Sequence, residues 1–168
     1  MLPVLAAGSV RAQSNATTVI DVIEVSGLLD PVNVDFMAGA LAEAEADGAS
    51  ALVLRLDSRG SVAPAADLRR LIAAIEGSEV PVAVWVGPGK EARATGKAFA
   101  LFEAAPVRGV APRSQVGQSS AEEALEAGVA TVAAATLGDF IVAIDGEAGI
   151  EVPTKVVKRD GRPPQQEL

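Results

Sequence analysis

The sequence predicts a single α/β domain with a largely parallel sheet. The chain has 168 residues, of which 49% are hydrophobic, so it can bury the core of one compact domain. Short aliphatic runs of strand length alternate with amphipathic stretches of helical period, and glycine-bearing turns separate them. This order of strand, turn and helix is typical of α/β folds.

The first half of the chain supplies the longest elements. Residues 18–25 are rich in β-branched side chains and predict a strand. Asp30 then fits a helix N-cap, Pro31 fits the first turn, and Gly48 ends a helix that runs to about Asp47. Three further elements are predicted from apolar runs and helical spacing: a strand covered on both faces at 51–57, a helix at 64–76 and a strand at 80–86.

Shorter elements are predicted in the second half. Ser120 and Glu123 have the spacing of a capping box, which opens a helix that Gly128 ends. The other elements predicted here are a helix at 92–105, strands at 109–111 and 129–133, a helix at 137–144 and an outer strand at 150–157 that Pro153 interrupts. We therefore expect a folded domain over residues 18–157 and a disordered tail over 158–168.

Composition excludes several classes of function. The formal net charge is −8, and the 14 basic residues form no stripe, which argues against a nucleic-acid surface. The chain has no cysteine and no histidine, so Ser-His-Asp and Cys-His mechanisms and the usual zinc ligands are excluded. Lysine or a carboxylate is then the only plausible general base. We expect no metal and no cofactor.

The N-terminus resembles the end of a secretory signal. Residues 1–12 form a short apolar segment that ends in Val10-Arg11-Ala12, which fits a small-x-small cleavage site, although the basic first region is missing. Two interpretations stay open: a truncated or unusual signal peptide, or an apolar N-terminus without a targeting role. No apolar run reaches the roughly 20 residues that a membrane span needs.

Two glycine-bearing turns, 57–61 and 86–89, mark the candidate site. Each follows a predicted strand and precedes a predicted helix, where α/β folds place ligands. A helix that starts near Ala92 would point its N-terminal amides over the second turn, and backbone at Gly60 can approach a ligand closely. The two turns could converge into an oxyanion hole. Alternatively, both are ordinary strand-to-helix connections.

Several segments resemble the long NfeD family of ClpP-class, membrane-associated serine peptidases. The turn Leu56-Asp57-Ser58-Arg59-Gly60-Ser61 is similar to that family's Leu-Asp-Thr-Pro-Gly-Gly segment. The other similar segments are residues 80–88, 94–99, 110–117 and 120–144, in the same order and spacing. The resemblance covers residues 19–157. It implies a ClpP/crotonase-like stack of ββα units and peptide hydrolysis by a serine-lysine dyad.

The resemblance places the nucleophile at Thr95, where the family has serine. It places the oxyanion and peptide-binding positions at Gly60, Ser61 and Gly96. A threonine nucleophile normally uses its own N-terminal amine as the base, and Thr95 is internal. At Ser61 the family's second glycine is replaced, which constrains the backbone of the turn. Nucleophile and oxyanion turn therefore both depart from the family pattern.

The position of the catalytic lysine, the base of the dyad, also departs from the family pattern. The family's lysine-bearing segment is largely absent, because the chain runs almost directly from Gly117 into the capping box. Lys97 cannot replace the dyad lysine within one chain, since residues two apart on a helix face away from each other. The residues therefore indicate a homologue with lost or strongly reduced peptidase activity.

Two alternatives stay open. The chain could be an active peptidase in which Thr95 is activated by Lys90, or by Lys97 of a neighbouring copy in a homo-oligomer. It could instead be a module that binds an extended segment of a stomatin- or flotillin-like membrane protein along a sheet edge. The resemblance and residues 1–12 together imply an exported location, with membrane association through a partner.

Overall fold

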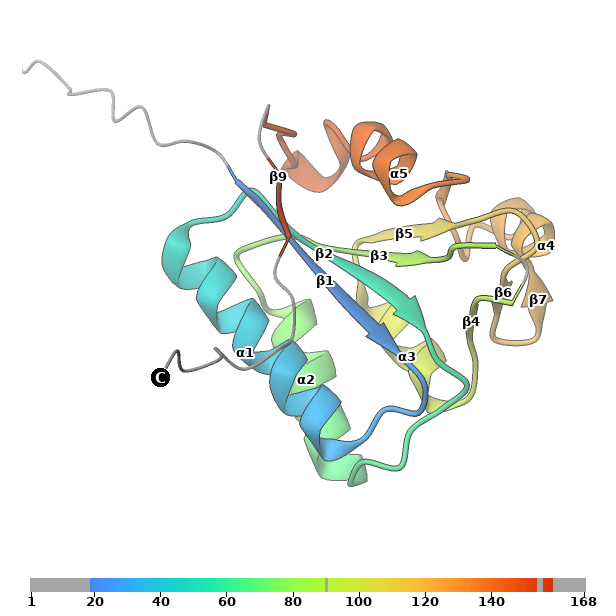
Figure 1. Cartoon of the computed structure of the whole chain (residues 1–168), viewed down its shortest axis with the longest axis horizontal. Coiled ribbons are helices and arrows are strands. Elements are labelled where there is room, and N and C mark those ends of the chain that lie inside the picture. Colours follow the sequence, from blue (N-terminus) through green and yellow to red (C-terminus); the bar gives the residue numbers. More distant parts are fainter. Residues whose placement is uncertain (1–18, 90, 154–155, 159–168) are drawn as a thin grey trace, which may run out of the picture.

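A parallel sheet forms the centre of the molecule (Figure 1). The structure is a computed structural model and describes residues 19–89, 91–153 and 156–158. Neighbouring strands of the sheet are parallel throughout, in the order β8-β5-β3-β2-β1-β9. The strands are β1 (Ile20–Ser26), β2 (Ala51–Asp57), β3 (Val82–Val86), β5 (Val107–Val110), β8 (Val132–Ala133) and β9 (Val156–Lys158). The predicted α/β class with a parallel sheet is confirmed.

Both faces of the sheet are covered, which explains why its central strands are almost uniformly apolar. Every residue of β3 is buried, and the first four of β2 are buried as well. Successive side chains alternate between the two faces. Leu52 and Leu54 therefore enter one hydrophobic core, while Ala51 and Val53 enter the other.

Three helices cover the first face: α1 (Pro31–Asp47), α2 (Ala65–Glu76) and α3 (Lys97–Ala104). The signals predicted for α1 are confirmed. The Asp30 carboxylate accepts a hydrogen bond from the amide of Asn33 at 2.7 Å, and Gly48 ends the helix in the left-handed conformation. The helix buries Val34, Met37 and Leu41 against the sheet.

The second face is covered by α5 (Leu137–Ala143). Its Phe140 ring stacks on Trp85, with ring centroids 6.4 Å apart. Gly109 packs directly against this ring. A Cβ at this position would lie only 2.3 Å from Phe140. The indole nitrogen of Trp85 donates to the carbonyl of Ala134 at 3.0 Å. The single tryptophan is thus a fully buried part of this core.

A second, smaller sheet lies beside the carboxyl end of β2 (Figure 1). It consists of β4 (Arg93–Ala94), β6 (Gln115–Val116) and β7 (Ser119–Ser120), in the order β4-β6-β7. The capping box predicted at Ser120 and Glu123 is present and opens α4 (Ala121–Glu126). A short 3₁₀ helix, η1 (Glu147–Gly149), follows α5.

The helix predicted at 92–105 is wrong in its first turn. Arg93 and Ala94 are extended because they pair with β6, and Ala94 also pairs with Ser58, so α3 begins only at Lys97. Three predicted strands have different limits in the structure. The strand predicted at 109–111 is β5, at 107–110, and the one predicted at 129–133 is the two-residue β8, at 132–133. Of the strand predicted at 150–157, only the end is extended, as β9 at 156–158. The disordered tail predicted at 158–168 is wrong at Lys158, which ends β9, while residues 159–168 and the predicted leader, residues 1–12, lie outside the described residues.

Candidate functional site

The turn after β2 packs against the segment that precedes α3. The amide of Ser58 donates to the carbonyl of Arg93 at 2.6 Å, and the amide of Thr95 donates to the carbonyl of Ser58 at 3.0 Å. A Cβ on Gly96 would lie 3.2 Å from the carbonyl oxygen of Arg59 and 3.5 Å from Cα of Gly60. We call the surface that these two contacting segments, residues 58–61 and 95–96, form together the crevice.

Side-chain hydroxyls hold the turn in shape. Ser58 is 1% exposed, and its hydroxyl donates to the carbonyl of Gly60 at 2.9 Å. The Ser61 hydroxyl donates to the carbonyl of Leu29 at 3.0 Å and accepts from the amide of Ala63 at 3.1 Å. Ser61 therefore fastens the turn to the segment after β1.

Backbone amides in the crevice remain available. Among the described residues, the amides of Ser61 and Gly96 make no hydrogen bond, and that of Gly60 makes one long contact of 3.4 Å to Ser58 Oγ. Gly96 has φ 58° and ψ −136°, a backbone conformation that essentially only glycine adopts. Donors of this kind are the ones that bind a carbonyl oxygen or an oxyanion.

The turn at 86–89 does not lead directly into a helix, in contrast to the prediction. It was predicted to lie beneath the start of a helix, but α3 begins at Lys97, several residues further on. Gly87 packs on the ring of Trp85, where a Cβ would be 2.4 Å away, and its carbonyl accepts from Nε of Arg55 at 3.2 Å. Arg55 also forms an ion pair of 3.0 Å with Glu24. This turn therefore has a packing role.

Thr95 lies at the edge of the crevice and is half-buried. Its hydroxyl donates to the carbonyl of Arg59 at 3.3 Å. No lysine in the described part of the chain contacts it: Lys97 is the exposed first residue of α3, and Lys90 lies outside the described residues. The turn between β6 and β7 leads directly into α4, and residues 115–126 contain no lysine.

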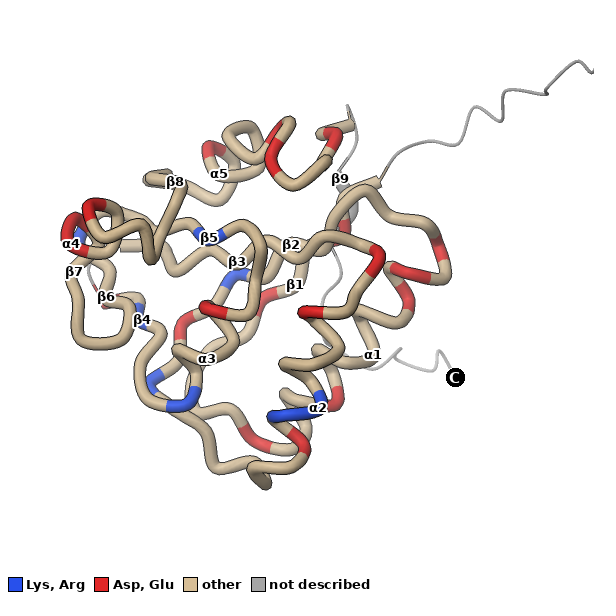
Figure 2. Tube along the Cα trace, turned by 180° about the vertical axis from the view of Figure 1, so that it is seen from behind, with Lys and Arg blue, Asp and Glu red and all other residues tan. Residues whose placement is uncertain are grey.

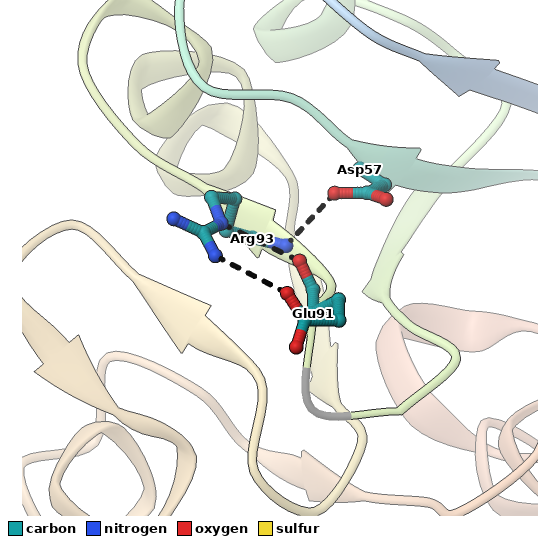
Figure 3. A network of polar contacts seen from close by, with 3 residues as sticks. All are labelled: Asp57, Glu91 and Arg93. Carbon is teal, nitrogen blue, oxygen red and sulfur yellow. Dashed lines mark hydrogen bonds and ion pairs between the residues drawn. The ribbon is translucent and has the colours of Figure 1, made fainter.

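A pocket of about 310 Å³ adjoins the turn and is lined by Gly27, Leu28, Asp57, Arg59 and Glu91. Arg93 connects its two carboxylates (Figure 3). The Arg93 amide donates to Asp57 Oδ1 at 3.1 Å, and Arg93 Nη2 lies 3.9 Å from Glu91 Oε2. Sequence reasoning missed the contribution of Glu91 and Arg93, because only the pairing of Ser58 with Ala94 brings them next to the turn.

The charge distribution agrees with the composition. Acidic residues lie on α1, α4 and α5, and basic residues are scattered among the elements (Figure 2). No basic stripe crosses the described residues in this view.

No protein-family model and no curated protein matches the sequence. Solved structures do match. The 1510-N membrane protease specific for a stomatin homolog from Pyrococcus horikoshii superposes with a TM-score of 0.75 at 18% identity, covering 88% of this chain and 94% of that one. A lysine-to-alanine variant of this stomatin-specific protease, in complex with a substrate peptide, has a TM-score of 0.73 at 18% identity. The match covers 89% of this chain and 94% of that chain.

More distant matches have the same architecture. A ClpP1 variant from Listeria monocytogenes has a TM-score of 0.58 at 10% identity, covering 70% of this chain and 93% of that chain. A structure from Bordetella parapertussis assigned as an enoyl-CoA hydratase/isomerase also has a TM-score of 0.58. Its sequence identity is 14%, and the match covers 76% of this chain and 74% of that chain. The fold is that of the ClpP/crotonase class.

The ClpP/crotonase fold is thus confirmed over nearly the whole chain, as the resemblance predicted. The 1510-N protease is membrane-bound. Within the residues described for this chain, no helix has both the length and the apolar character needed to cross a bilayer.

Proposed function

We propose that this ClpP/crotonase-like chain is an NfeD-like homologue that binds an extended peptide in the crevice and has little or no peptidase activity. One observation carries the proposal. The hydroxyl at the nucleophile position, Thr95 Oγ1, donates to the carbonyl of Arg59 and contacts no base among the described residues. A hydroxyl becomes a competent nucleophile only when a neighbouring group accepts its proton.

Peptide binding is supported by groups that the crevice retains. The amides of Ser61 and Gly96, which have no partner among the described residues, can donate to a peptide carbonyl. Leu28 and Val62, which are 54% and 64% exposed, flank the Gly60 turn. Apolar side chains held in water beside unpartnered amides favour a ligand that is apolar and extended.

Among the described residues, Lys97 offers a route to hydrolysis. Lys97 is exposed at the start of α3, so a neighbouring copy could present its Lys97 to Thr95. This second candidate is an active peptidase that works only as an oligomer. It predicts turnover that rises with protein concentration and disappears in Lys97→Ala.

The ligand class follows from the comparisons as a proposal. Because the 1510-N protease is specific for a stomatin homolog, we propose that an extended segment of a stomatin- or flotillin-like membrane protein occupies the crevice. Residues 1–12 support an extracytoplasmic location. Both proposals are tested by co-purification of the exported chain with membrane proteins of this class.

Binding of short, apolar, fluorescein-labelled peptides, followed by fluorescence polarisation, tests the central proposal. Leu28→Ala and Val62→Ala remove exposed side chains next to the crevice, and each is expected to weaken binding about fivefold, a loss of about 1 kcal/mol. Val142→Ala is the matched control, since Val142 is 73% exposed on α5, the helix that covers the opposite face of the sheet. Absence of binding, or equal losses in all three variants, would contradict the proposal.

A further inference from the structure

The pocket beside the crevice contains a cation without a partner. Arg59 lines the pocket and is exposed, and its guanidinium makes no ion pair or hydrogen bond with any other residue that the structure describes. Its carbonyl accepts the hydrogen bond of Thr95. The same residue therefore borders the crevice with its backbone and lines the pocket with its side chain.

The carboxylates of the pocket are both associated with Arg93. Asp57 accepts from the Arg93 amide, and Glu91 lies 3.9 Å from the Arg93 guanidinium, which also donates from Nε to the Glu91 carbonyl at 3.4 Å (Figure 3). The Glu91 carboxylate faces the Arg93 guanidinium, whereas Asp57 is held by the uncharged main-chain amide of Arg93, and no contact joins either acid to Arg59 among the described residues. The guanidinium of Arg59 thus keeps its planar set of donors, which fits a carboxylate.

We infer that Arg59 makes this pocket a specificity subsite for an acidic side chain, Asp or Glu, of the peptide bound in the crevice. The inference rests on the proposed function and names the class of its ligand. The similar turn of the NfeD family has proline at this position, which carries no charge, so the subsite is a property of this chain. A pocket of about 310 Å³ accommodates a carboxylate side chain between Arg59 and Leu28.

The test uses the intact chain and the peptide set described above, in which each position in turn is Asp, Asn or Lys. At one position, Asp is expected to bind about three- to tenfold more tightly than Asn, the size of a partly exposed charge pair. Arg59→Ala is expected to bring this ratio to about one, and added salt to reduce it. Arg69→Ala, which removes an exposed arginine of α2, keeps the ratio.

Each outcome separates the two claims. Peptides that bind with equal affinity as Asp and Asn variants would overturn the subsite and leave the proposed function intact. A preference for Lys would show that Asp57 and Glu91 dominate the pocket, and would also overturn the inference. If no peptide binds, the proposed function itself fails.

Discussion

The hydroxyl of Thr95 donates to the main-chain carbonyl of Arg59 at 3.3 Å, and these residues are 36 positions apart in the sequence. The bond joins Thr95, which the resemblance places at the nucleophile position, to the turn that the resemblance expects to bind an oxyanion. A serine-lysine dyad would instead direct this hydroxyl toward an amine. The contact therefore supports a structural role for Thr95.

Thr95→Val should lower the free energy of unfolding by about 0.5–1 kcal/mol, because valine keeps the shape of threonine but loses the hydrogen bond. Thr95→Ser keeps the hydroxyl and serves as the control. Urea unfolding can be followed by the fluorescence of Trp85, the only tryptophan. Equal stability of the Val and Ser variants would show that the bond contributes nothing.

Gly96→Ala should destabilise the chain by about 1–3 kcal/mol, since alanine is strained at this backbone conformation and its Cβ would press on the Arg59 carbonyl. Gly39→Ala is a contrasting control. Gly39 lies within α1 with nothing near its Cβ position, so alanine there should stabilise by about 0.5–1 kcal/mol. Thermal unfolding measures both. A neutral Gly96→Ala would contradict the close approach of the two segments.

Gly109→Ala should cost at least about 1–3 kcal/mol, because the new Cβ would overlap the ring of Phe140. Gly138→Ala, on α5 itself, has only an ordinary contact at 3.8 Å and should be tolerated. Near-ultraviolet circular dichroism of Trp85 reports whether its stacking on Phe140 is lost. Wild-type stability in Gly109→Ala would mean that α5 does not pack as described.

Local signals predicted the elements that depend on local chemistry. Asp30, Pro31 and Gly48 fixed the limits of α1 because caps act within one turn, and the capping box at Ser120 did the same for α4. The first turn predicted for α3 failed because strand pairing by Arg93 and Ala94 overrides helix propensity, and nothing local announces that pairing.

The candidate site was predictable only in part. Gly60, Ser61, Thr95 and Gly96 were expected from the family resemblance, and the structure places them together. The pocket beside them was not expected. Its residues come from the ends of β1 and β2 and from the segment before β4. Their proximity therefore depends on the tertiary pairing of these segments, which no local pattern in the sequence indicates.

Hydrolysis of the apolar peptide set by the full chain, by Thr95→Ala and by Thr95→Ser tests the central claim most directly, with mass spectrometry of the products. If the chain binds peptides without cleaving them, none of the three proteins will release product above the buffer control, and Thr95→Ser will not restore turnover. Cleavage by the native chain that disappears in Thr95→Ala would contradict this account and would identify a working threonine peptidase.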